Sequence, residues 1–384
     1  MSTYRSNRAR RAGNVLVLAL VFLVTMISFV ALAVDVGYLY TVRNELQRSA
    51  DAAAIAAAWE LIDEDGPSGG QNAFAVTNDA YATAAQYAAL NPIANQPPAL
   101  ASDDVTVGLM ANPADPACPL LPADGTSMPN AVQVRVQRTS LQNGEAPLFF
   151  ARVMGYDSLA IEAQATAALL NNISGFELPA DGSNLEILPF ALDVETWDAL
   201  LAGVGSDNYR FDKASDTVSA APDGILEVNL YPQATGSPGN RGTVDIGGSN
   251  NSTSDIARQI VHGINSGDMQ ALQDGGRTLE LNSDGELELN GDTGISAGVK
   301  DELTGIIGLP RIIPIFGSVT EPGNNAEYTI IKFVGVRVMH VKLTGSMSSK
   351  KVILQPCNIV AKGGVLSTDG QNSNFIYSPV WLVR

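Results

Sequence analysis

The most constraining feature of this chain is an uncharged apolar run near its start, from Asn14 to Val34 (NVLVLALVFLVTMISFVALAV). As an α-helix with a rise of about 1.5 Å per residue, this run is long enough to cross the ~30 Å hydrocarbon core of a bilayer. It is preceded by the arginines Arg5, Arg8, Arg10 and Arg11. Basic residues that flank a span favour the cytoplasmic side. The sequence therefore predicts a single-pass membrane protein, with the N-terminus in the cytoplasm and the bulk of the chain across the membrane.

The helix is expected to continue well beyond this span. From Asp35 no Pro or turn cluster interrupts the chain before residues 63–67 (DEDGP). In between, apolar residues recur every three or four positions, which is the period of one helix face. These residues are Leu39, Val42, Leu46, Ala50, Ala53 and Ala57. We expect one helix of about 48 residues, whose small-residue face packs closely against a neighbouring element.

Composition constrains the partners of the chain. The sequence holds 23 Lys and Arg against 40 Asp and Glu, a formal net charge of −17. An acidic protein repels nucleic acid, so no nucleic-acid partner is expected. Cys118 and Cys357 are the two cysteines. A disulfide between them and two separate thiols both remain open at this stage.

The part from residue 35 to residue 170 is expected to form a helical stalk and an α+β unit. Asn72 to Leu90 predicts a second Ala-rich helix, which ends at Asn91-Pro92. Asp104 to Leu109 and Ala131 to Arg138 alternate apolar and polar residues, as half-buried strands do. Leu159 to Leu170 is expected to be a third strand.

From residue 171 to residue 384 the pattern favours a sheet-rich, mixed α/β domain. Thr278 to Leu289 predicts a hairpin around Asp284-Gly285. Further predicted strands include Tyr328 to Leu343 and Phe375 to Val383, with a helix at Ser252 to Ile264. The expected fold class is thus α+β, and residues 1–13, 14–34, 35–170 and 171–384 are the tail, the span, the stalk unit and the sheet-rich domain.

The N-terminal arrangement of RRAGNVLVLAL, AVDVGYLY and RNELQRSADAAAIAAA resembles the TadG-like Flp pilus-assembly proteins of the bacterial tight-adherence machinery. The resemblance is specific from Arg10 to Ala58 and looser from Tyr81 to Ala168. It implies that the α+β unit of residues 35–170 is pilin-like. It also implies a bacterial inner-membrane protein with a periplasmic bulk, which binds other pilus-assembly proteins. Association of copies through the N-terminal helix is a further expectation.

Two processed forms compete with a retained anchor. Signal peptidase would cut after Ala33 and release an exported hydrolase, but the apolar run is longer than the usual ~7–15 residues, and the cut would sever the predicted helix. Prepilin peptidase would cut after Gly13 and give a minor pilin or adhesin. Pseudopilins of that kind usually carry Glu at the fifth mature position, where this chain has Leu18.

The sequence indicates no catalytic residue, cofactor or metal site. His262 and His340 are the two histidines, and neither belongs to a nucleophile or metal motif. Some TadG-like proteins carry a von Willebrand A-type domain, but the Asp-x-Ser-x-Ser loop of its metal site is missing here. Glu280 to Gly291 lacks the final Glu of a calcium loop.

One long polar loop, residues 236–255 (GSPGNRGTVDIGGSNNSTSD), is the first choice for a partner-binding surface, although a plain surface loop before a capped helix also explains it. Ser252 and Asp255 fit a capping box at the start of the following helix. The candidate residues are Asn240, Arg241, Asp245, Ser252 and Asp255. The function expected from the sequence is scaffolding, without catalysis, in Flp pilus assembly or an associated secretion apparatus.

Overall fold

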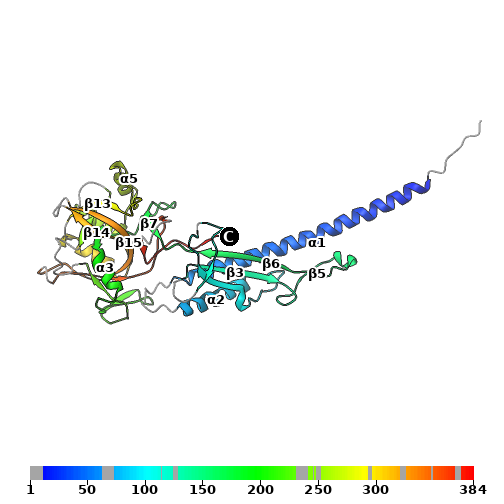
Figure 1. Ribbon diagram of the computed structural model, residues 1–384, viewed down its shortest axis with the longest axis horizontal. Helices are drawn as coiled ribbons and strands as arrows, with labels where there is room; N and C mark the ends of the chain where they lie inside the picture. The colour runs from blue at the N-terminus through cyan, green and yellow to red at the C-terminus, as the bar shows by residue number, and fades with distance from the viewer. Residues whose placement is uncertain are drawn as a thin grey trace, which may run out of the picture.

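In the computed structural model, a long helix projects from one end of the molecule and a sheet-rich body forms the other end (Figure 1). The structure describes residues 12–62, 73–113, 115–123, 129–230, 241–244, 246–247, 252–292, 296–320, 326–346, 349–367 and 373–384. This α+β architecture, with a long apolar helix before a sheet-rich part, confirms the fold class expected from the sequence.

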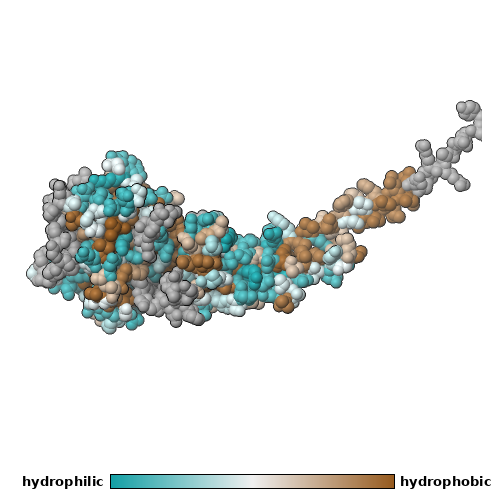
Figure 2. Space-filling view, in the orientation of Figure 1, coloured by the Kyte–Doolittle hydropathy of each residue, from teal (hydrophilic) through white to brown (hydrophobic). Residues whose placement is uncertain are grey.

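Helix α1 (Ala12–Trp59) has 48 residues and is continuous. Its first half carries large apolar side chains that are all exposed, from Val15 to Val34. Its second half is a core element, because Val42, Leu46 and a series of alanines have no exposed surface. One helix therefore serves two environments, and Figure 2 shows the apolar surface of the projecting half.

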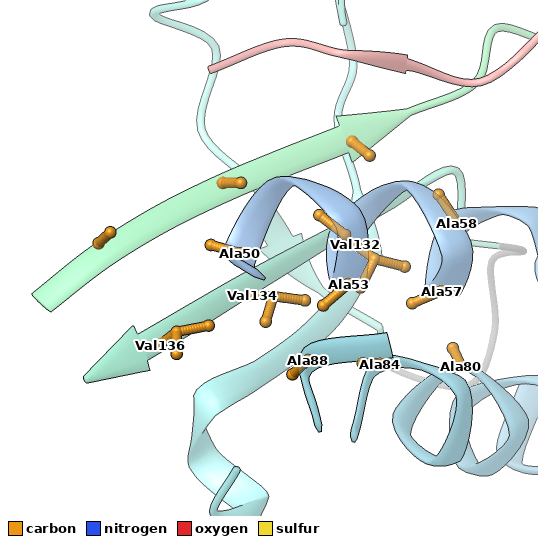
Figure 3. Close-up of a cluster of buried hydrophobic side chains, with 14 of the residues drawn as sticks. Ala50, Ala53, Ala57, Ala58, Ala80, Ala84, Ala88, Val132, Val134 and Val136 are labelled. Carbon is orange, nitrogen blue, oxygen red and sulfur yellow. The ribbon is translucent and has the colours of Figure 1, made fainter. Parts of the chain in front are cut away.

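The second half of α1 packs on helix α2 (Ala73–Leu90) and on an antiparallel sheet. The strand order is β2 (Leu121–Pro122), β1 (Val105–Leu109), β3 (Ala131–Arg138), β6 (Ile161–Ala168) and β21 (Trp381–Leu382). The alternation in β3 turns its three valines toward the alanines of α1 and α2 (Figure 3). Strand β21 comes from the end of the chain and pairs with β6, so the sheet combines residues that are far apart in sequence.

A hairpin-like arm extends from this unit between β3 and β6. Its base is the strand pair β4 (Ala146–Pro147) and β5 (Ser158–Leu159), and its tip contains the 3₁₀ helix η2 (Ala151–Met154). Gly155 follows η2 with φ of 89°, a left-handed conformation that favours glycine. A second 3₁₀ turn, η1 (Ser102–Asp104), precedes β1.

The sheet-rich body is built around strand β15 (Ala326–Lys342). One edge of β15 pairs with β14 (Pro310–Thr320), and β14 also pairs with β8 (Phe190–Asp193). Strands β12 (Arg241–Val244) and β13 (Leu287–Asp292) connect β8 back to β15, so these five strands close into a ring. Strands β16 (Lys351–Pro356) and β11 (Val228–Asn229) extend the sheet beyond the C-terminal half of β15.

Helices pack around this sheet. They are α3 (Val194–Leu201), α4 (Thr253–His262), α5 (Ser266–Asp274), η3 (Ala297–Val299) and α6 (Lys300–Gly305). Side chains of α3, α4 and α6 lie in one of the apolar clusters of the sheet, and side chains of α5 lie in the other. The short strands β7 (Ile173–Phe176), β9 (Arg210–Asp212), β10 (Thr217–Ser219), β17 (Ile359–Val360), β18 (Gly364–Leu366), β19 (Ser373–Asn374) and β20 (Ile376–Tyr377) complete the body. Trp197, Phe190 and Phe333 are among its largest fully buried side chains.

Two local predictions were wrong. The turn in Thr278–Leu289 forms, since Gly285 N–H donates to the Asn282 carbonyl at 2.9 Å, but its arms do not pair as a hairpin. The first arm bonds to β7, and the second arm is β13, which pairs with β15. The expected strand Phe375–Val383 is divided into β20 and β21, which pair with β17 and β6. In both cases distant strands offered better partners than the local ones.

The two cysteines are not joined by a disulfide. Cys118 lies in the loop before β2 and is half-buried, and Cys357 is buried just after β16. Of the two alternatives left open by the sequence, the structure therefore contains two separate thiols and not a disulfide.

Candidate functional site

The first part of the candidate site is the exposed half of α1. Within the described part of the chain, α1 alone is long and apolar enough to cross a membrane. Two of its side chains in the span are hydroxyls: Thr25 donates to the Val21 carbonyl at 2.8 Å, and Ser28 donates to the Val24 carbonyl at 2.9 Å. These bonds satisfy polar groups that would otherwise be costly in a hydrocarbon environment.

The second part of the site is the small-residue face of α1 that the sequence predicts. Val42, Leu46, Ala50, Ala53 and Ala57 are fully buried, and Leu39 is half-buried beside them. Figure 3 shows the alanines of this face meeting α2 on one side and β3 on the other. Two polar contacts fix the register: Ser49 Oγ donates to the Ala88 carbonyl at 3.2 Å, and Gln47 Nε2 donates to the Gln164 carbonyl at 3.1 Å.

This arrangement constrains how α1 can meet another molecule. The small-residue face is filled by α2 and the first sheet of the same chain, because alanine lets backbones approach closely. An association between copies through α1 would therefore use residues that remain exposed, such as 15–34, and not the small-residue face.

The third part is a junction at Asp35, the first charged residue after the apolar run. Its side chain is buried, with 3% of the residue surface exposed. One carboxylate oxygen accepts from Phe149 N–H at 2.8 Å, and the other accepts from Phe150 N–H at 3.0 Å and Ala151 N–H at 2.7 Å. Tyr38, one turn further along α1, meets the Phe149 ring edge to face at a centroid distance of 5.2 Å.

Asp35 thus ties the arm to α1 at the point where the apolar run ends. Sequence reasoning missed both the role of Asp35 and the arm that it holds. A single acidic residue placed directly after a predicted span, before a second apolar stretch, was the available indication.

The other predicted site residues lie apart from this junction. Arg5, Arg8, Arg10 and Arg11 lie outside the described residues, as do Asn240 and Asp245. Arg241 begins β12, where its backbone pairs with Leu192. The partner-binding role of this loop therefore stays a prediction.

Ser252 and Asp255 lie at the start of α4. Ser252 Oγ accepts from Asp255 N–H at 3.3 Å, which is one half of a capping box. The Asp255 carboxylate turns instead to the Arg258 guanidinium at 2.6 Å. Arg258 also pairs with the buried Asp268 of α5. These residues join two helices of the body.

Two titratable groups of the body whose pKa is shifted, His340 and Glu227, have structural partners. The His340 ring stacks on Tyr209 at a centroid distance of 5.1 Å, and burial, with Lys351 and Lys342 nearby, lowers the pKa of His340. Burial raises the pKa of Glu227, whose carboxylate accepts from Asn208 N–H at 3.1 Å. Among the described residues, no group of three or more His, Cys, Asp or Glu is placed to hold a metal ion.

Comparison with known families gives matches in the part of the chain that contains α1 and the arm. A family model described as Flp pilus-assembly TadE/G-like matches residues 13–60, and one described as Tad-like Flp pilus-assembly matches residues 56–167. No curated protein and no solved structure matches the chain. The first match covers α1 almost entirely, and the second runs from the end of α1 through α2, the arm and nearly all of β6. Residues 13–60 of this chain are thus similar to the Flp pilus-assembly TadE/G-like family, and residues 56–167 to the Tad-like Flp pilus-assembly family.

Proposed function

We propose that this protein is a membrane-anchored, non-catalytic component of Flp pilus assembly, or of an associated secretion apparatus, that acts by scaffolding and protein–protein binding. The observation that carries the proposal is α1, whose exposed apolar half continues without a break into a folded core. This core belongs to the unit of residues 35–170, here called the family unit. The anchor and the folded unit therefore share one rigid element.

This continuity has a mechanical meaning. A flexible linker would let the extracytoplasmic part rotate freely, whereas a continuous helix packed into a core keeps it at a defined angle to the membrane. Other pilus-assembly proteins would then meet a surface at a fixed height and orientation. Such geometry suits a scaffold, because preorganised surfaces lose less freedom on binding.

The proposed orientation places the N-terminus in the cytoplasm and the acidic bulk in the periplasm. The four arginines before the span support it. We further propose the division into residues 35–170, the unit that contains most of the residues matched by the family models, and residues 171–384. Apart from β21, which pairs with the first sheet, residues 171–384 form a body that gives this protein its own binding surfaces. The loop at residues 236–255 is the part of that body proposed to contact a partner.

The first experiment determines the intact mass and the N-terminal sequence of the protein from a cell membrane fraction. Retention of the residues before Asn14 supports the permanent anchor. A start at Asn14 would move the protein to the processed pilins, and a soluble species starting at Val34 would favour an exported enzyme.

A second experiment separates anchoring from assembly. In cells that depend on this protein for piliation, residues 15–34 are replaced by an unrelated apolar span of equal length, or the span is followed by an efficient signal-peptidase site. Piliation is expected to persist with the first variant and to fail with the second, while both accumulate. Normal piliation by the released form would contradict the proposal.

A further inference from the structure

The tip of the arm exposes an unusual concentration of apolar side chains. Val153 is 91% exposed, and its exposed neighbours share this apolar or aromatic character. They are Phe149, Phe150, Met154 and Tyr156. Single exposed apolar residues are common on soluble proteins, but a contiguous group on one projecting segment marks an interaction surface.

The position of this group relates it to the membrane helix. Asp35 holds the backbone of Phe149, Phe150 and Ala151, so the arm tip lies against α1 where the apolar run ends. Figure 1 shows the arm running beside α1 toward the exposed, apolar end of that helix. Ala31, within the run, is partly covered, unlike its neighbours. The exposed tip is therefore continuous with the surface of α1 that would face lipid.

We propose that residues 149–156 insert into the interface of the bilayer that α1 crosses, as a second attachment to lipid. This inference rests on the proposed function, because it requires α1 to span the membrane. Aromatic residues prefer the boundary between headgroups and acyl chains, which is the level of the end of a span. Arg152, exposed on the same tip, can extend to anionic headgroups while Val153 and Met154 enter the apolar layer.

The backbone of the tip is suited to this environment. A polar backbone group without a partner is costly in lipid. The N–H groups of Phe149, Phe150 and Ala151 are bonded to the Asp35 carboxylate. Further along, Val153 N–H donates to Phe150 O at 3.1 Å, and Tyr156 N–H donates to Ala151 O at 3.1 Å. Asp35 therefore satisfies donors that would otherwise face the apolar layer.

The occupant argued for is lipid rather than a protein partner. The apolar residues project from a convex tip and continue the surface of the span, and Asp157, a carboxylate at the base of the arm, sets a limit to how deeply the tip can enter. Two attachments, one through the bilayer and one at its surface, would fix the tilt of the whole extracytoplasmic part.

The test places an environment-sensitive fluorophore on three positions of the full-length protein in vesicles of phosphatidylethanolamine and phosphatidylglycerol. The variants are Val153→Cys, Val204→Cys and Val24→Cys, each in a Cys118→Ser/Cys357→Ser background. Val204 is the matched control, since it is a 68% exposed valine on the distal body. Quenching by lipids brominated in the acyl chain is compared with quenching by iodide in the water.

We expect the label at position 153 to be quenched several-fold more by brominated lipid than the label at position 204, and to be shielded from iodide. If position 153 behaves like position 204 while position 24 is quenched by lipid, the arm proposal is overturned and the anchor stands. If position 24 is also unquenched by lipid, the anchor itself fails. A label at 153 that is shielded from iodide but not quenched by lipid would overturn lipid as the occupant and assign the tip to a protein.

A second measurement needs no substitution and so does not depend on the folding of the cysteine variants. Hydroxyl-radical footprinting of the wild-type chain in the same vesicles compares Tyr156, which is 66% exposed, with Tyr87 on α2, which is 43% exposed. Insertion predicts that Tyr156 is oxidised more slowly than Tyr87, in spite of its greater exposure. Faster oxidation of Tyr156 would contradict insertion.

Discussion

At the scale of single residues, Asp35 connects the apolar and polar parts of the molecule. A buried carboxylate is unfavourable unless its oxygens are bonded, and here backbone N–H groups from the arm bond to both of them. These are charge-assisted hydrogen bonds, which are stronger than neutral ones. One side chain thus fixes the position of a segment that lies 114 residues later in the sequence.

Replacing Asp35 by Asn should loosen the arm without disturbing the core. The amide keeps the shape but has one acceptor oxygen and no charge, and each lost bond to a charged group is worth about 1.5–3 kcal/mol. Hydrogen exchange of residues 148–156 is expected to accelerate strongly. Asp51→Asn is the control, because Asp51 lies on the same helix and accepts from Gln47 at 2.7 Å without contact to the arm. Equal exchange in both variants would show that Asp35 does not hold the arm.

At the scale of elements, alanine determines how α1 and α2 meet. Ala80, Ala84 and Ala88 of α2 form one fully buried row, opposite the alanines of α1 (Figure 3). A methyl side chain allows the helix backbones to approach closely, and it leaves no room for a larger group. The packing is therefore sensitive to added volume on one side of α2 and insensitive on the other.

The matched pair Ala84→Leu and Ala82→Leu tests this packing. Both changes add the same side chain to the same helix, but Ala84 is buried and Ala82 is exposed. Overpacking at Ala84 is expected to cost about 1–3 kcal/mol or more in the free energy of unfolding. At Ala82 the free energy should change by less than about 0.5 kcal/mol. Thermal denaturation of the full-length protein in detergent compares the two, and similar midpoints would refute close packing of α2.

The elements also show what the sequence could predict. The full length of α1, α2 and the strands β1 and β3 follow from local periodicity, which reports the face that each element buries. The arms around Asp284-Gly285 and the divided strand after Phe375 were not predicted correctly, because their partners are distant in sequence. The Asp35 junction was missed for the same reason. Periodicity gives the buried face of an element but not the partner that covers it.

At the scale of the whole molecule, the chain returns to its first sheet after completing the body. Trp381 and Leu382 pair with Ala168 and Ala167 of β6. Val383 N–H donates to the Thr166 carbonyl at 2.8 Å, and the Arg384 guanidinium donates to Pro116 O at 2.9 Å. This strand covers the edge of β6, which would otherwise present unpaired backbone groups.

Deletion of residues 381–384 should therefore weaken a strand that lies in the family unit. We expect faster hydrogen exchange in β6, and an unchanged rate in β14, because several backbone bonds of about 0.5–1.5 kcal/mol each are lost. Arg384→Ala is the control, since it removes the bond to Pro116 and leaves the strand pairing intact. If the deletion changed exchange in β6 no more than this control does, β21 would not stabilise the sheet.

Strand β21 lies far along the chain from the other strands of its sheet, and this affects how the protein folds during export. Four strands of the first sheet come from residues 105–168, whereas Leu170 and Ser378, which hydrogen-bond beside β21, are 208 residues apart. In the proposed orientation the earlier residues leave the translocon first, and the edge of β6 stays open until residues 381–382 follow. If export stopped early, the edge of β6 would stay uncovered. Chaperones and proteases of the envelope could then recognise the incomplete product by this open edge. The sheet of the family unit is therefore complete only after the residues between β6 and β21 have been exported.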